Sequence, residues 1–141
     1  MPSSTGWRAC APAYTRSVAE PESADLYTLY QRGMSLLESG DYAQAAVPLA
    51  RAARMAPEKT SIREALGRAY FRSSRFGEAA AEFEAIVETH PVDDYAHFCL
   101  GRALTKCGRR ERARHHLALA SNLRPERGDY RLYRDRLRAS A

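Results

Sequence analysis

The sequence predicts an all-α protein, an α-solenoid of three helix-turn-helix hairpins followed by a C-terminal capping helix. Two observations predict this class. Residues recur at an interval of 34, and inside each interval apolar residues recur at three and four positions, which is the period of a helix. The chain has 141 residues, 45% of them hydrophobic and 28% charged. This composition suits one folded domain, and the length is too short for two full-sized cores.

Four kinds of residue keep the interval of 34 through three copies. A glycine inside a helix costs about 1 kcal/mol relative to alanine, so its recurrence indicates that a neighbouring helix approaches the backbone closely. The prolines end the second helix of each copy, because proline lacks an amide hydrogen and disfavours helix at the preceding residue. The recurring residues are Gly33, Gly67 and Gly101; Ala45, Ala79 and Ala113; Leu49, Phe83 and Leu117; and Pro57, Pro91 and Pro125.

These copies set the expected boundaries along the chain. We expect hairpins over about 26–59, 60–93 and 94–127, within a repeat domain over 24–141. Residues 1–23 contain three prolines and no apolar periodicity, which predicts disorder. In residues 129–138, Tyr130, Tyr133 and Leu137 share one face, as in a helix that covers the end of a stacked array. Thr60, Asp94 and Asp129 stand where a capping residue would open the next helix.

The second copy, with Leu66-Gly67, Tyr70, Ala79, Phe83 and Pro91, resembles the tetratricopeptide repeat family. The resemblance covers roughly residues 24 to 125 and implies a right-handed superhelix whose first helices line a concave groove. The first copy departs most from the pattern, since Arg32 replaces the usual leucine before the glycine. Pro48 also falls inside its second helix, where we expect a distorted or shortened segment.

The resemblance also implies which positions of each first helix face the groove. Aromatic rings beside arginines there suit a peptide or helical segment with apolar anchors and acidic groups, because arginine both pairs with carboxylates and stacks on rings. The alternative is that these rings pack against one another and the arginines are solvated. The candidate partner-binding residues are Tyr27, Tyr30, Met34, Glu64, Arg68, Phe71, Arg72, Tyr95, Phe98, Arg102 and Lys106.

One subtype of the family is testable from the sequence. Members that bind the acidic C-terminal tail of chaperones carry lysine, asparagine and arginine at five groove positions. None of the corresponding residues here fits that pattern, so we expect no chaperone-tail clamp. These residues are Tyr30, Met34, Ala65, Tyr95 and Cys99.

The sequence offers little for catalysis or metal binding. No HExxH, GxSxG or GxxxxGK string occurs, and the three cysteines lack CxxC spacing. We therefore expect no catalytic residue, no metal and no cofactor. We also expect Cys99 to be a buried, inert thiol rather than a reactive one. No stretch is long and apolar enough for a membrane span, and residues 1–23 lack the apolar core of a secretory signal, which favours a cytoplasmic protein without membrane contact.

The sequence thus favours a non-catalytic adaptor that binds a peptide of another protein, with two alternative functions. Exposed hairpin ends would allow self-assembly as a structural module. Eleven of the 22 basic residues fall from Lys106 onward, which would suit a nucleic-acid-associated factor, although no aromatic-basic motif accompanies them. Residues 1–23, with Trp7 and Tyr14, could also dock in the groove of the same chain.

Overall fold

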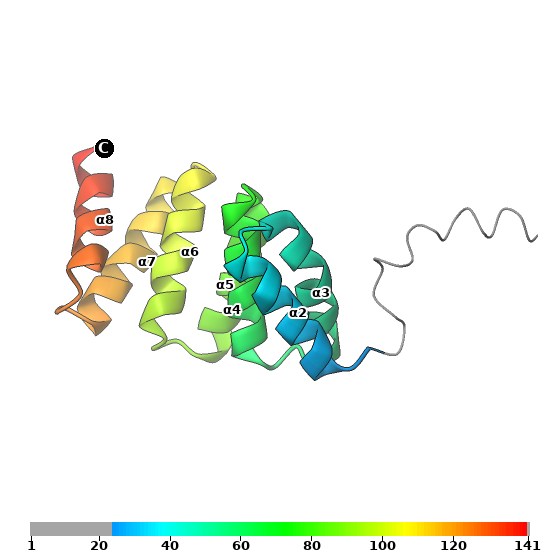
Figure 1. Cartoon of the computed structure of the whole chain (residues 1–141). Coiled ribbons are helices and arrows are strands. Elements are labelled where there is room, and N and C mark those ends of the chain that lie inside the picture. The colour runs from blue at the N-terminus through cyan, green and yellow to red at the C-terminus, as the bar shows by residue number, and fades with distance from the viewer. Residues whose placement is uncertain (1–23, 141) are drawn as a thin grey trace, which may run out of the picture.

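The computed structural model describes residues 24–140, which form seven α-helices and no strand (Figure 1). The predicted all-α class is confirmed. The first helices of successive hairpins and the last helix begin 34 residues apart, and so do the second helices. In chain order the helices are α2 (Leu26–Glu38), α3 (Tyr42–Met55), α4 (Thr60–Arg72), α5 (Phe76–Thr89), α6 (Asp94–Lys106), α7 (Arg110–Leu123) and α8 (Gly128–Ala139).

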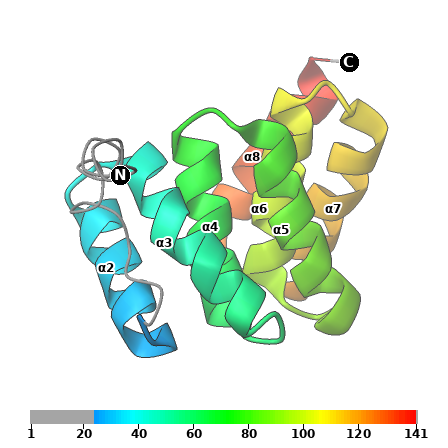
Figure 2. The same ribbon diagram turned by 90° about the vertical axis from the view of Figure 1, so that its right-hand side faces the viewer.

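The helices stack in chain order, and each packs mainly against its neighbours in the sequence. Helices α2 and α8 therefore lie toward opposite ends of the array in Figure 1, and in the view of Figure 2 helix α8 lies behind α4, α5 and α6. Such an array is held together by contacts inside each hairpin and between adjacent hairpins. The disorder expected for residues 1–23, and the docking of Trp7 and Tyr14, lie outside the described residues.

The recurring glycines lie where two helices of one hairpin meet. A Cβ atom added at Gly67 would lie 2.7 Å from ring atoms of Phe83, and one at Gly101 would lie 2.7 Å from side-chain atoms of Leu117. Gly33 has the same relation to Leu49. The predicted close approach is confirmed: the large residue of the second helix occupies the space that a side chain would need.

Two local expectations were wrong. Pro48 lies inside α3, but α3 has 14 residues and runs without interruption, like α5 and α7. The proline ring is fully buried, and this burial offsets the lost backbone hydrogen bond. The capping residues also lie earlier than expected. Asp93, not Asp94, accepts the hydrogen bond from the Ala96 amide at 3.0 Å, while Thr60 and Asp129 are already inside their helices.

In helices α4, α6 and α8, a side chain of the first turn bonds to the loop that precedes the helix. Arg63 Nε donates to the carbonyl oxygen of Pro57 at 2.9 Å, and His97 Nε2 lies 2.8 Å from that of Pro91. Arg131 donates to Pro125 in the same way. These residues are 34 apart, so one loop geometry recurs with two different side-chain types.

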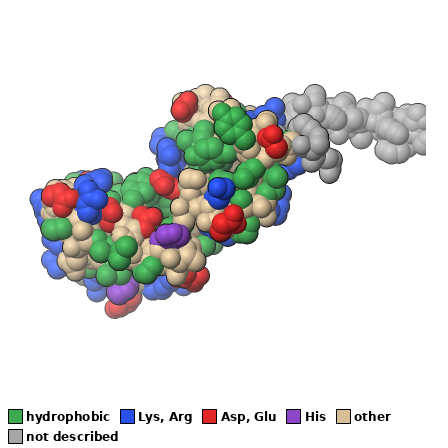
Figure 3. Space-filling model, turned by 90° about the horizontal axis from the view of Figure 1, so that it is seen from below, with side chains coloured by type: hydrophobic (Ala, Val, Ile, Leu, Met, Phe, Trp, Pro, Cys, Tyr) green, Lys and Arg blue, Asp and Glu red, His purple; other side chains and the backbone are tan. Residues whose placement is uncertain are grey.

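Helix α8 covers the end of the third hairpin, as predicted for a capping helix. Tyr130 is fully buried, and its ring centroid lies 4.6 Å from that of Phe98. The Tyr130 hydroxyl donates to Asp94 Oδ2 at 2.6 Å, which ties α8 to the start of α6. The face seen from below carries acidic and basic side chains interspersed with apolar ones (Figure 3). Within residues 24–140, no helix has the length and apolar character needed to cross a membrane.

Candidate functional site

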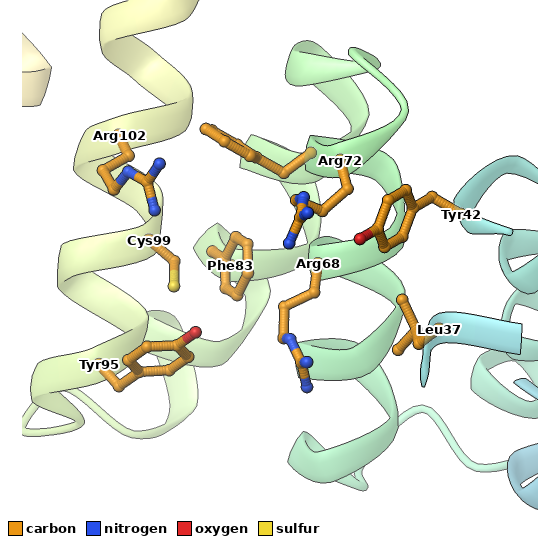
Figure 4. A pocket seen from close by; sticks show the side chains of 9 residues that line it. Leu37, Tyr42, Arg68, Arg72, Phe83, Tyr95, Cys99 and Arg102 are labelled. Carbon is orange, nitrogen blue, oxygen red and sulfur yellow. The ribbon is translucent and has the colours of Figure 1, made fainter. Parts of the chain in front are cut away.

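A pocket of about 150 Å³ opens between α4 and α6 (Figure 4). Arg68 and Arg72 reach it from α4, and Tyr95 and Arg102 reach it from α6. Five of the eleven residues expected from the register line this pocket, so the structure brings the middle of that set together. Its lining residues are Leu37, Tyr42, Arg68, Phe71, Arg72, Phe83, Tyr95, Cys99 and Arg102.

A second pocket, of about 370 Å³, continues the first toward α8. The two share Phe71 and Arg102, so they form one surface, which we call the inner groove. The second pocket also contains Lys106, another of the expected residues. It is lined by Phe71, Arg102, Thr105, Lys106, Leu117, Tyr133, Arg136, Leu137 and Ser140.

Aromatic rings hold the cations of the inner groove in place. The guanidinium carbon of Arg72 lies 4.4 Å from the centroid of the Tyr42 ring. That of Arg102 lies 4.8 Å from the Phe71 ring and 4.9 Å from the Tyr133 ring, so two helices clamp it. Stacking of this kind restricts the guanidinium plane and leaves its N–H edges available to an acceptor.

Within the described part of the chain, these cations have no carboxylate partner. Elsewhere in the described chain, arginines form ion pairs, such as Arg75 with Glu78 at 2.7 Å and Arg63 with Glu82 at 2.9 Å. Within residues 24–140, no carboxylate oxygen lies within 4.0 Å of a charged nitrogen of the basic residues in the inner groove. These residues are Arg68, Arg72, Arg102, Lys106 and Arg136.

Glu64 is an acidic residue of α4 that interacts electrostatically with Arg68 of the inner groove. Burial raises the pKa of its carboxyl group, and the positive charge of Arg68 opposes that rise. Burial also raises the pKa of the Tyr95 hydroxyl and raises the pKa of the Cys99 thiol to about 12. Cys99 is therefore a protonated thiol at neutral pH and a poor nucleophile.

The remaining expected residues lie apart from the inner groove. Tyr27 is 68% exposed on α2, and Tyr30 and Met34 pack against the core formed by α2, α3 and α4. Phe98 is only 5% exposed, because Tyr130 and Tyr133 of α8 cover it. The expected exposure of Phe98 on the groove surface is therefore wrong, and Phe98 does not line the inner groove.

Among the tyrosines and basic residues that line the inner groove, the register analysis missed Tyr42, Tyr133 and Arg136. One of them had a signal in the sequence. Arg68, Arg102 and Arg136 are 34 residues apart, so extending the repeat into the last helix identifies Arg136. The other two had none, because Tyr42 belongs to a second helix and Tyr133 lies outside the groove positions of the repeat.

The described residues offer no arrangement suited to metal binding: no group of three or more His, Cys, Asp or Glu side chains in residues 24–140 could hold an ion. Cys99 is buried and Cys107 is exposed, and both are free thiols.

Comparison with known proteins decides the family. A model of the tetratricopeptide repeat matches residues 30–94 and, one repeat later, residues 64–125. The chain belongs to the tetratricopeptide repeat family. Its array of hairpins is the fold of that family, as the sequence indicated. No curated protein matches the sequence significantly.

Solved structures agree on the fold of this tetratricopeptide repeat protein. MamA from Desulfovibrio magneticus RS-1, in a form starting at its residue 41, is similar at 24% identity and a TM-score of 0.79, over 84% of this chain and 67% of that one. The first TPR of Spaghetti (RPAP3), bound to the HSP90 peptide SRMEEVD, is similar at 17% identity and a TM-score of 0.76, over 85% of this chain and 98% of that one. The first TPR domain of human RPAP3 is similar at 18% identity and a TM-score of 0.73, over 81% of this chain and 90% of that one.

Proposed function

We propose that this tetratricopeptide repeat protein is a non-catalytic cytoplasmic adaptor that binds an acidic peptide segment of a partner protein in the inner groove. The observation that carries the proposal is the set of inner-groove cations without carboxylate partners in residues 24–140, four of which lie against aromatic rings: Arg72, Arg102, Lys106 and Arg136. Arginines fixed in this way lose little side-chain entropy when they pair with an acidic ligand. The rings beside them offer contacts for apolar side chains of the same peptide. No cofactor is part of this proposal.

The Spaghetti domain, described as bound to the HSP90 peptide SRMEEVD, supports the idea that a domain of this fold can bind a peptide rich in carboxylates. The clamp positions that the family uses for chaperone tails hold unsuitable residues here, among them Tyr30, Met34 and Ala65. We therefore propose a different acidic segment, one that meets Arg68, Arg72 and Arg102 instead.

Two other functions were considered from the sequence. Nucleic-acid binding gains little from the basic C-terminal region, because five of its eleven basic side chains already pair with carboxylates: Arg112, Arg124, Arg127, Arg134 and Arg138. Self-assembly through the ends of the array has no comparable support. A light-scattering series over protein concentration tests it directly, because the apparent mass of an assembling protein rises with concentration.

A display library of random 12-residue peptides tests the adaptor proposal. The wild-type protein should enrich peptides that combine acidic and apolar residues. An Arg68→Glu/Arg102→Glu variant should bind the enriched peptides at least tenfold more weakly in fluorescence anisotropy, and salt should weaken the wild-type complex.

The matched control is Lys59→Glu/Arg109→Glu, which changes the net charge equally at two exposed residues outside the inner groove. This control should keep wild-type affinity. If the library yields no enriched acidic peptide, or if both double variants lose affinity equally, the inner groove is not the binding site.

A further inference from the structure

The part of the inner groove next to α8 gathers three cations and no acid. Arg102 and Lys106 are four residues apart on α6 and therefore lie on the same face of that helix. Arg136 comes from α8, and its guanidinium carbon lies 5.5 Å from the centroid of the Tyr133 ring, on which Arg102 also stacks. The two guanidinium groups thus share one ring, and the 370 Å³ pocket beside them contains no carboxylate side chain.

The positions of these cations are set by packing rather than by ion pairs. Arg102 is clamped between Phe71 of α4 and Tyr133 of α8, and the Lys106 ammonium lies 5.8 Å from the centroid of the Phe76 ring. Like charges gathered in one pocket repel one another, so an anion bound there gains from all three at once. The arrangement favours a small ligand with more than one negative charge.

We propose that this pocket binds a phosphorylated side chain of the partner peptide, held by Arg102, Lys106 and Arg136. The inference rests on the proposed peptide-binding function and names the group that the C-terminal end of the inner groove recognises. A phosphate monoester carries about −1.5 to −2 charges at pH 7 and presents three acceptor oxygens, whereas a carboxylate carries one charge. Clusters of arginine are a common way to recognise such a group.

The charge of the rest of the groove fixes where the phosphate binds. Among residues 24–140, no acidic side chain lines either pocket of the inner groove. At the N-terminal end, the carboxyl group of Glu64 nevertheless interacts electrostatically with Arg68, which offsets part of the positive charge there. A doubly charged group is therefore bound next to α8, and singly charged or apolar residues of the peptide lie toward α4. In this role α8 is part of the binding site as well as the cap of the array.

The test uses the full chain and small probes, so that it does not depend on a peptide sequence. The probes are phosphoserine, phosphotyrosine and glutamate, each acetylated at its amino group and amidated at its carboxyl group. In an NMR titration, one of the phosphorylated probes should shift amide signals of Arg102–Lys106 and Tyr133–Ser140. The glutamate probe should bind at least tenfold more weakly, and the comparison of the two phosphorylated probes identifies the phosphorylated residue.

Arg136→Gln is the informative variant, and Arg138→Gln is its control. Both remove one charge from exposed positions of α8, but Arg138 lies outside the pocket and faces Asp135 at 3.7 Å. Arg136→Gln should weaken the phosphorylated probe at least tenfold, and Arg138→Gln should change it less than twofold. Circular dichroism should show wild-type helix content for both variants.

Three results would overturn the inference: equal binding of the glutamate and phosphorylated probes, equal effects of the two variants, or tighter Arg136-dependent binding of a single-stranded oligonucleotide. The last result would assign the pocket to a nucleic-acid phosphate. None of the probes needs the N-terminal half of the inner groove. If only the phosphate inference fails, the peptide library still yields acidic peptides that require Arg68 and Arg102; if the adaptor proposal fails, it yields none.

Discussion

Mild acid should destabilise this protein through the buried His97–His116 pair of the third hairpin. The two Nδ1 atoms lie 3.0 Å apart, and His97 Nε2 faces the carbonyl oxygen of Pro91 at 2.8 Å. A carbonyl can only accept, so His97 Nε2 carries a hydrogen, and the 3.0 Å contact is a hydrogen bond when His116 Nδ1–H donates to His97 Nδ1. A proton added to His116 then places a charge in a buried site, where His97 itself offers no compensating negative charge.

The size of the effect follows from the pKa of His116. Burial, together with the nearby His97 and His115 rings, lowers this pKa from its ordinary value of 6.5 to about 4, while Glu84 acts in the opposite direction and Arg112 adds to the lowering. Because the folded value is depressed, the unfolded chain binds more protons between pH 6.5 and pH 4. The contribution of His116 to stability is complete above pH 6.5 and is lost as the pH falls toward 4. Between pH 8 and pH 5 this loss lowers the free energy of unfolding by about 2 kcal/mol.

The second hairpin suggests a variant in which the loss of stability between pH 8 and pH 5 should be reduced. Arg63 and Glu82 occupy the positions 34 residues before His97 and His116, and they form an ion pair at 2.9 Å while Arg63 also donates to Pro57. The double variant His97→Arg/His116→Glu transfers this arrangement to the third hairpin. Urea unfolding at pH 8 and pH 5 should show the loss in the wild type and less than half of it in the variant.

Comparison of the two proteins cancels the contribution of every titrating group that they share. A wild type equally stable at pH 8 and pH 5 would refute the reasoning, as would a variant with the same pH dependence as the wild type. The single variant His116→Gln separates the charge effect from packing, since it removes the titrating ring and should also flatten the pH dependence.

Three further substitutions have expected effects on urea unfolding. Ser74 has a φ of 66° in the turn between α4 and α5, so Ser74→Gly should raise the free energy of unfolding by about 1 kcal/mol; no gain would mean that the turn is unstrained. Tyr130→Phe removes the hydrogen bond to Asp94 but keeps the ring, and should lower the free energy of unfolding by about 2 kcal/mol. An unchanged free energy of unfolding would show that ring packing alone holds α8. Gly67→Ala places a methyl group against Phe83 and should cost about 1 to 3 kcal/mol, and a neutral result would contradict the close helix approach.

Much of the fold could be predicted because each part of it depends on residues close in the sequence. The glycine of a first helix and the large residue 16 positions later, as in Gly67 and Phe83, belong to one hairpin, so their contact repeats whenever the sequence does. The uninterrupted helix at Pro48 could not be predicted in this way. Its outcome depends on how well a buried ring offsets a lost hydrogen bond, which local propensity does not measure.

The candidate site was less accessible to the same reasoning, because its two pockets are formed by residues of different hairpins. Register identified Arg68, Arg72 and Arg102, and the same interval of 34 would have added Arg136. It could not separate Phe98, whose position in the repeat resembles that of an exposed groove residue. Whether such a ring is exposed depends on the next helix in the array, here α8.

By itself, the sequence determined the repeat length, the hairpins, the close helix contacts at glycine and the cations carried by the first helices. These features follow from helical periodicity and from side-chain size, both of which are local. Only the tertiary structure decided that Phe98 is covered, that Tyr133 and Phe71 clamp Arg102, and that the basic residues of the inner groove lack carboxylate partners. Those facts depend on distances between side chains of separate hairpins, which arise only when the helices pack against one another.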